Sequence, residues 1–297
     1  MASRSNIEFK TLDGVVLRGW LYATPARRPG VVITPGFNCV KEMFVPDVAE
    51  YFQKAGINAL VYDPRTLGDS DGLPRNDVDP LRQVSDYSDA LSFLCAQPSV
   101  DETRVAFWGM SVSASVALCA AALDRRAKVC LAICPMLNME TPPDKRDAVL
   151  AKSMQDRQSQ TIGGNGPTYI PLLNSEGRNP AGLGFHTGPE ELAFMESAKS
   201  HGAPNYENRT TLQTYYKLLM WKPHSIIKYL RNTATLMIVP ELDNISPPEE
   251  QLALFDTFPQ PKLSYVAPGK GHLNVLGGED FASSMELQVD WLLKHCG

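Results

Sequence analysis

The arrangement of apolar runs between residues 31 and 134 constrains the fold more than any other feature of this sequence. Four short runs, VVIT, INALVYD, RVAFWG and KVCLAIC, alternate with helix-length stretches such as VPDVAEYFQKAG and VSASVALCAAAL. Runs that are apolar throughout are typical of strands buried on both faces, as in parallel sheets covered by helices. The alternation therefore predicts an α/β fold with a mostly parallel sheet.

Both ends of the chain extend this pattern. The segments IEFKTLDG and VVLRGWLYAT flank Asp13 and Gly14, a pair typical of tight turns, so an antiparallel hairpin is expected at the N-terminus. Near the C-terminus the runs ATLMIVP and KLSYVAP predict strands, and PPEEQLALFDTF and SSMELQVDWLLKH predict helices. The sheet is therefore expected to continue after residue 234.

The alternation stops between these two parts. Residues 136–223 contain helix-like pieces (DKRDAVLAKSMQDRQ, PEELAFMESAKS and TLQTYYKLLMW) separated by Gly, Asn and Pro clusters such as IGGNGPTYIP. A long interruption of this kind inside a compact domain is usually functional. We predict that residues 136–223 form a helical cap inserted after the sixth strand, and that residues 1–135 and 224–297 form the core domain.

Composition excludes several classes of function. The chain has 297 residues, 43% of them hydrophobic and 21% charged, with a net charge of -5. These values are those of an ordinary globular protein, with no basic footprint for nucleic acid and no polybasic membrane patch. A small-molecule substrate is therefore expected.

Cysteine usage and hydropathy bear on location. The six cysteines fall mostly inside apolar runs, and no C-x-x-C pair suggests zinc or redox chemistry. The N-terminal residues lack an apolar signal core, and no run approaches the ~20 apolar residues of a membrane-spanning helix. A cytoplasmic location without stable membrane insertion is therefore expected.

Ser111 is the candidate nucleophile. It lies in the segment GMSVS, directly between the predicted strand RVAFWG and the predicted helix VSASVALCAAAL. A strand-turn-helix context of this kind presents a serine at the edge of a parallel sheet in serine hydrolases. The helix N-terminus also makes the Val112 N–H a candidate donor to an oxyanion. The alternative is that Ser111 only caps this helix.

The motif departs from the G-x-S-x-G pattern at one position. Ser113 stands where the pattern has its second glycine, which allows strand and helix to approach closely. Serine is the next smallest polar residue. The departure leaves room for chemistry other than hydrolysis.

Asp243 and His272 are the candidate partners of Ser111. Each follows a predicted strand, in the loops PELDNISPPE and APGKGHLNVLGG, where functional groups of open α/β sheets collect. The chain order Ser, Asp, His is the order expected for this fold. Glu241 is the alternative acid. The competing histidines are His186, His201, His224 and His295.

Further site residues are predicted from loops and from the cap. The loop ITPGFNCVKE follows the first predicted parallel strand, and its Phe37 N–H is the second candidate oxyanion donor, because Gly36 permits a tight turn. The loop DPRTLGDSDG is expected to have a structural role, with Arg65 paired to an acid. Met110, Tyr215 and Trp221 are the candidate substrate-binding residues.

Taken together, these motifs give a family resemblance. With Ser111, Asp243, His272, GFNCVKE and DPRTLGDSDG in this order, the chain resembles the α/β-hydrolase superfamily over essentially its whole length. The stretch from GFNCVKE to DPRTLGDSDG is similar to a fungal branch that includes polyketide transferases and related hydrolases of secondary-metabolite pathways.

The resemblance implies a function. It implies an acyl substrate, free or carried by another molecule, no cofactor, and hydrolysis or transfer of an ester or thioester held on the serine. The apolar cluster at residues 215–221 favours a bulky, largely apolar acyl group. One alternative is a condensation or cyclisation enzyme with His272 as the general base. Another is a binding protein on a hydrolase scaffold.

Overall fold

The computed structural model describes residues 4–139, 141–182, 187–200 and 202–296. In chain order the elements are β1 (Ser5–Lys10), β2 (Val16–Tyr22), β3 (Arg28–Thr34), α1 (Pro46–Lys54), β4 (Asn58–Tyr62), α2 (Pro80–Cys95), β5 (Val100–Met110), α3 (Val112–Leu123), β6 (Ala127–Ile133), α4 (Pro143–Thr161), β7 (Tyr169–Ile170), α5 (Pro189–Ser200), β8 (Thr210–Thr211), α6 (Leu212–Met220), α7 (His224–Ile227), β9 (Ala234–Pro240), α8 (Pro248–Asp256), β10 (Lys262–Ala267) and α9 (Phe281–His295).

One large sheet organises the molecule. Among the described residues it has eight strands in the order β1-β2-β4-β3-β5-β6-β9-β10. β1, β2 and β4 pair antiparallel, and every other neighbouring pair is parallel. The predicted mostly parallel sheet with an N-terminal antiparallel hairpin is therefore confirmed. The hairpin turns at Gly14, whose φ of 92° suits glycine.

Helices cover both faces of this sheet, as the continuous apolar strands require. On one face, α2, α3 and α8 pack on the strands through a cluster that includes Leu91, Leu118 and Phe255. On the other face, α1 and α9 pack through a second cluster that includes Phe52 and Leu292. The parallel strands are thus buried on both sides, and polar groups at their carboxyl ends lie along one edge of the sheet.

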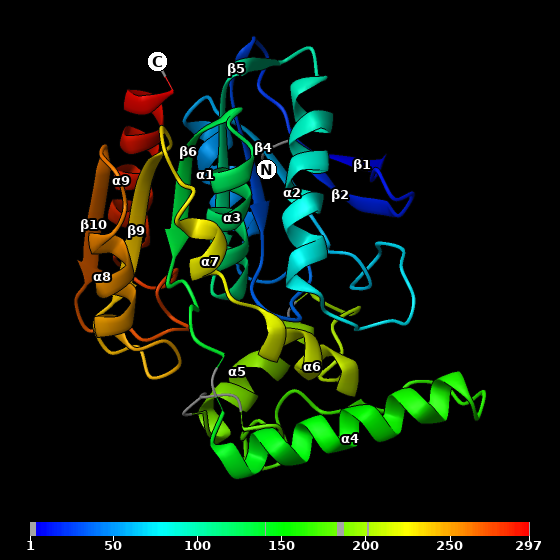
Figure 1. Cartoon of the computed structure of the whole chain (residues 1–297). Coiled ribbons are helices and arrows are strands. Elements are labelled where there is room, and N and C mark those ends of the chain that lie inside the picture. Colours follow the sequence, from blue (N-terminus) through cyan, green and yellow to red (C-terminus); the bar gives the residue numbers. More distant parts are fainter. Residues whose placement is uncertain (1–3, 140, 183–186, 201, 297) are drawn as a thin grey trace.

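The helical segment after the sixth strand lies at that edge. Figure 1 shows α4, α5 and α6 together below the carboxyl ends of the strands, with α4 along the outside. Within this segment, β7 and β8 pair as a small antiparallel sheet, which the sequence did not predict. The division into a core domain and a cap at residues 136–223 stays a prediction.

The described residues include no helix with the length and apolar character needed to cross a membrane.

Candidate active site

Ser111 lies at a sharp turn between β5 and α3. Its backbone has φ 60° and ψ −125°, a conformation that is rare for any residue except glycine and concentrates at functional sites. The Ser111 N–H donates to the Ile133 carbonyl at 2.9 Å, and its own carbonyl accepts from the Met136 N–H at 3.1 Å, which holds the turn. The Ser111 side chain makes no capping hydrogen bond to α3. Helix capping therefore does not account for it.

The structure of this turn explains why Ser113 can replace the second glycine of the G-x-S-x-G pattern. A Cβ atom on Gly109 would lie 2.2 Å from the Ser113 carbonyl oxygen, so the strand and helix backbones meet at this glycine. Ser113 itself is helical and buried, and the turn accommodates its side chain. The Tyr87 hydroxyl lies 2.9 Å from the Trp108 carbonyl oxygen and 3.3 Å from that of Ser113, and joins α2 to both ends of the turn.

The fold brings Ser111, His272 and Asp243 together. The Ser111 Oγ lies 2.8 Å from His272 Nε2, and His272 Nδ1 lies 2.8 Å and 3.0 Å from the two Asp243 carboxylate oxygens. All three residues are buried. This is the arrangement of a serine, a base and an acid that orients the base.

The loop after β9 holds the Asp243 carboxylate in place. One oxygen accepts hydrogen bonds from the Ile245 and Ser246 N–H groups at 2.9 and 2.8 Å. The other accepts from the Gln251 side-chain amide at 3.1 Å. The loop therefore fixes the acid, and through it the orientation of the His272 ring.

The alternative groups lie elsewhere. Glu241 accepts a hydrogen bond from the Gly269 N–H at 2.7 Å, whereas Asp243 is the acid at His272 Nδ1. His224 begins α7 and His295 ends α9. His186 and His201 lie outside the described residues.

Two neighbours set the charge preference of His272. Burial by itself lowers the pKa of His272, but Cys134 and the hydrogen-bonded Asp243 carboxylate outweigh burial, so the pKa lies above the usual 6.5. Cys134 Sγ lies 4.0 Å from His272 Nε2. The Asp243 carboxylate therefore stabilises the positive charge that His272 gains when it accepts a proton.

The two candidate oxyanion donors border Ser111. α3 begins at Val112, so the Val112 N–H has no acceptor within the helix. A Cβ atom on Gly36 would lie 3.5 Å from Ser111 Cβ, which places the Gly36–Phe37 turn against the serine. In the described part of the chain the Phe37 N–H donates no hydrogen bond. Both N–H groups are thus available at this turn, although their oxyanion role stays a prediction.

Neighbouring residues hold the loop that carries Phe37. The Asn38 side-chain amide donates to the Glu207 and Arg209 carbonyls at 3.0 and 3.1 Å. The Lys41 N–H donates to Asp63 at 2.7 Å, and its ammonium group donates to the same carboxylate at 2.8 Å. The loop is therefore tied both to the helical segment and to the loop after β4.

Arg65 has the structural pairing that the sequence predicted. Its guanidinium donates to Asp86 on α2 at 2.7 Å and to Asp13 in the hairpin turn at 2.8 Å. Arg65 and Asp86 are both buried. The pairing joins three parts of the chain that are distant in sequence.

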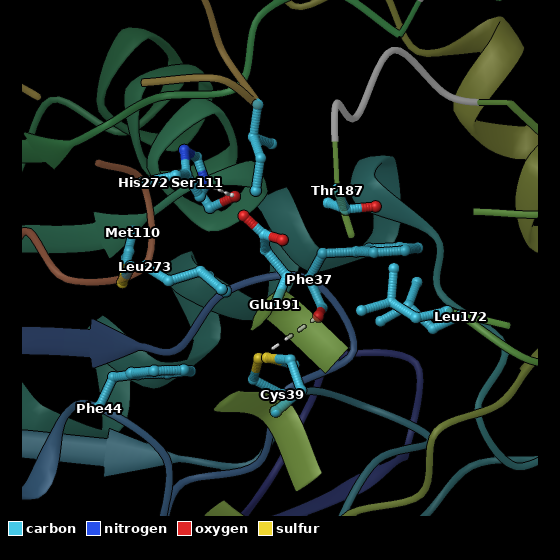
Figure 2. A pocket seen from close by; sticks show the side chains of 14 residues that line it. Phe37, Cys39, Phe44, Met110, Ser111, Leu172, Thr187, Glu191, His272 and Leu273 are labelled. Carbon is cyan, nitrogen blue, oxygen red and sulfur yellow. Dashed lines mark hydrogen bonds between the residues drawn. The ribbon is translucent and has the colours of Figure 1, made fainter. Parts of the chain in front are cut away.

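A cavity opens next to Ser111 and His272. Figure 2 shows these two side chains together at one side, with Phe37, Leu172 and Thr187 at the other. Most of its surface is apolar, which suits an acyl chain. The lining residues are Gly36, Phe37, Cys39, Phe44, Met110, Ser111, Leu172, Leu173, Thr187, Glu191, Met195, Ile245, His272 and Leu273.

Of the candidate substrate-binding residues, Met110 lines this cavity, whereas Tyr215 and Trp221 do not. Tyr215 and Trp221 belong instead to the large buried cluster that also contains residues of α2 and α3. The Tyr215 hydroxyl accepts a hydrogen bond from the Asn179 amide at 2.9 Å. The apolar stripe of α6 thus packs inward rather than over Ser111.

Other residues of the helical segment contribute to the cavity. Leu172 and Leu173 come from an irregular stretch without periodicity, so sequence reasoning had no signal for them. Glu191 and Met195 are four residues apart on α5, so they share one helix face. That spacing was visible in the sequence, but nothing in it indicated which surface the face contacts.

The described residues contain one set of side chains that could hold a metal ion, namely Cys134, Asp243 and His272, with ligand atoms within 4.8 Å of one another. His272 and Asp243 are already joined by their hydrogen bonds. We therefore assign these residues to the serine site.

The fold and this arrangement of serine, histidine and aspartate define a class, the α/β-hydrolases. The sequence matches the model of the Alpha/beta hydrolase family over residues 31–283. The chain belongs to this family.

Individual relatives place the chain more closely. It is 59% identical over 289 residues to a protein of Eupenicillium brefeldianum named thiohydrolase, with 97% of this chain and 94% of the relative covered. It is 41% identical over 295 residues to polyketide transferase af380 of Aspergillus fumigatus, with 99% of each chain covered. These relatives confirm the predicted resemblance to the fungal polyketide transferase branch.

Solved structures agree with this placement. The structure of DcsB in complex with its substrate analogue is similar at a TM-score of 0.93 and 44% identity, covering 99% of this chain and 100% of that one. The α/β-hydrolase GrgF from Penicillium sp. sh18 is similar at a TM-score of 0.90 and 38% identity, covering 99% of each chain.

Proposed function

We propose that the protein is a serine hydrolase or acyltransferase that cleaves an acyl thioester or ester through an acyl-enzyme on Ser111. One observation carries the proposal. The Ser111 hydroxyl, the His272 ring and the Asp243 carboxylate form a continuous line of hydrogen bonds beside an apolar cavity. A serine hydroxyl is a weak nucleophile and needs such a base.

In the first half of the reaction, His272 Nε2 takes the Ser111 proton as Oγ bonds to the acyl carbon. The Val112 and Phe37 N–H groups donate to the oxyanion that forms. The bond from carbon to the leaving sulfur or oxygen then breaks, and the imidazolium returns the proton to the leaving group. In the second half, an acceptor O–H gives its proton to His272 as its oxygen bonds to the acyl carbon. The bond from that carbon to Ser111 Oγ then breaks, and the imidazolium returns the proton to Oγ.

The substrate class follows from the cavity and the relatives. The lining favours an apolar acyl segment next to the reacting carbon. The cavity has a volume of about 80 Å³, which accommodates the part of a long acyl chain nearest the reacting carbon. Relatives named thiohydrolase, polyketide transferase and acyltransferase support a thioester donor, with water or another hydroxyl as acceptor.

Paired serine variants test the proposal. Thiol release from an acyl thioester of N-acetylcysteamine is measured for wild type, Ser111→Ala and, as a control on the same turn, Ser113→Ala. We expect Ser111→Ala to lose about 10³-fold or more in kcat and Ser113→Ala to stay near wild type. Turnover that survives in Ser111→Ala but not in His272→Ala contradicts the acyl-enzyme and points to His272 acting alone as base.

A further inference from the structure

The Phe37 N–H, one of the two candidate oxyanion donors, lies in a tight turn. The Cys39 N–H donates to the Gly36 carbonyl at 3.2 Å, which closes a four-residue turn around Phe37. Asn38 is the third residue of this turn and has a φ of 57°. A positive φ at the third position is typical of a type II turn, and glycine and asparagine adopt it with little strain. The turn therefore favours a residue such as Asn38 at this place.

The backbone of the turn alone does not call for asparagine, because glycine would serve as well. Asn38 is 1% exposed, and its side-chain amide donates to the backbone carbonyls of Glu207 and Arg209 at 3.0 and 3.1 Å. Both carbonyls lie in the stretch between α5 and β8. The Asn38 amide therefore ties the Phe37 turn to the helical segment.

The stretch at residues 207–209 is itself held in place. The Arg209 N–H donates to the Glu207 carbonyl at 2.8 Å. The Asn208 side chain accepts from the Leu173 N–H at 3.0 Å and donates to the Leu173 carbonyl at 2.9 Å. Leu173 lines the cavity beside Ser111. The same three residues thus hold both a wall of the cavity and the turn that carries the Phe37 N–H.

The turn lies against the nucleophile. A Cβ atom on Gly36 would lie 3.5 Å from Ser111 Cβ, and Figure 2 shows the Phe37 and Cys39 side chains at the same cavity as Ser111. A donor stabilises an oxyanion when it lies about 2.7–3.1 Å from the position that the oxygen takes, and small displacements are costly. A shift of the turn would therefore weaken the Phe37 hydrogen bond without removing any group from the site.

We propose that Asn38 is a positioning residue, which ties the Phe37 turn to the backbone at residues 207–209 and so places the Phe37 N–H at the oxyanion. The inference rests on the proposed acyl transfer from Ser111 and assigns a further residue to it. Asn38 acts through Phe37. Its loss should raise the barrier to the tetrahedral intermediate and leave binding of the substrate nearly unchanged.

Two ketone inhibitors measure the oxyanion interaction separately from chain binding. When hexyl trifluoromethyl ketone binds, Ser111 Oγ bonds to the carbonyl carbon, His272 takes the hydroxyl proton, and the carbonyl oxygen becomes an oxyanion. Hexyl methyl ketone has the same chain but adds to serine far less readily. The ratio of their inhibition constants therefore reports oxyanion stabilisation. We expect wild type to bind the trifluoromethyl ketone about 100-fold more tightly or better.

Two substitutions remove the tether and keep the turn. Asn38→Gly retains a residue suited to a positive φ, and Asn38→Asp keeps the side-chain shape but replaces the N–H donor with an acceptor. In both variants we expect this ratio and the kcat of thioester cleavage to fall by about tenfold or more, with KM close to wild type. The matched control Asn205→Ala removes an amide that ties the helical segment to Asp69 at 2.7 Å, and should keep both values.

The outcomes separate this inference from the proposed function. Because the ratio compares two ligands on one protein, loss of folded protein does not change it. An unchanged ratio in either Asn38 variant overturns the proposal, because both variants lack the N–H donor. A raised KM with unchanged kcat assigns Asn38 to the cavity wall and also overturns it. A ratio near one in wild type, or a high ratio that survives in Ser111→Ala, contradicts the serine adduct and thus the proposed function itself.

Discussion

At the scale of single residues, the environment of His272 determines how the site responds to pH. Burial opposes a charge on the ring, but Cys134 and Asp243 outweigh burial and raise its pKa above 6.5. Formation of the free base is therefore shifted to higher pH than for an unperturbed histidine. The stabilisation that charged His272 gives the fold is full below its unfolded pKa and is lost as pH rises through the folded pKa.

Replacement of Asp243 by asparagine tests this assignment. The asparagine side chain carries no charge, so the acid limb of the kcat/KM profile is expected to move to lower pH than in wild type. The rate should also fall, by about 10³- to 10⁴-fold, because the ring loses the partner that orients it. Glu241→Gln is the control. An acid limb that shifts in Glu241→Gln and not in Asp243→Asn contradicts the assignment.

The three residues of the serine site were easier to predict from the sequence than the other residues that line the cavity. Ser111, Asp243 and His272 were identifiable because each lies in the loop or turn that follows a strand, and the ends of parallel strands meet at one edge. Leu172 and Glu191 reach the same cavity from a segment without strand periodicity. Their position depends on long-range packing, which spacing along the chain does not encode.

At the scale of elements, the crossing of β5 and α3 is the critical junction. A side chain at Gly109 meets the Ser113 carbonyl at 2.2 Å, while Ser113 carries its own side chain in the helix. The first glycine of the motif is therefore required by the backbone contact, and the second position tolerates serine. The turn at Ser111 can therefore keep its geometry although Ser113 replaces the second glycine of the motif.

Two substitutions at this junction have different expected costs. Gly109→Ala should lower the free energy of unfolding by about 1–3 kcal/mol or more, because the backbones must separate. Ser113→Gly should cost only about 0.5–1 kcal/mol, the usual penalty of glycine in a helix. Urea unfolding measures both. A Gly109→Ala protein as stable as wild type means that strand and helix are not in contact there.

The sequence predicted the long elements but not the short ones. The apolar runs of β3 to β6 and the helices between them were visible because burial on two faces leaves little choice of residue. β7 and β8 have two residues each, too few to show a period. The α6 stripe was recognised as apolar, but its spacing did not show that Tyr215 and Leu218 join the large buried cluster and do not line the cavity.

At the scale of the whole molecule, Arg65 links two parts of the structure that are distant from each other in the sequence. Its guanidinium bonds Asp86 on α2 and Asp13 in the β1–β2 turn. Burial raises the pKa of Asp86 to about 6, against the lowering effect of Arg65. A negative charge on the buried Asp86 carboxylate is therefore stabilised by the guanidinium of Arg65.

Removal of Arg65 leaves that carboxylate without its ion pair. Arg65→Ala is expected to lower the free energy of unfolding by about 3–5 kcal/mol. Arg82→Ala removes an exposed arginine that lies 3.6 Å from Asp13, and should change stability by less than about 0.5 kcal/mol. Denaturant unfolding of both proteins checks the difference. Equal stability of the two variants contradicts a structural role for the buried pair.

The central claim is that Ser111 carries the acyl group during turnover, and mass spectrometry tests it most directly. The protein is mixed with an acyl thioester, quenched in acid during the first turnovers, weighed intact and then digested. The account predicts a protein heavier by one acyl group, with the added mass on the peptide that contains Ser111 and none on Ser111→Ala. Full turnover without any acylated protein, or an acyl group on another residue, contradicts it.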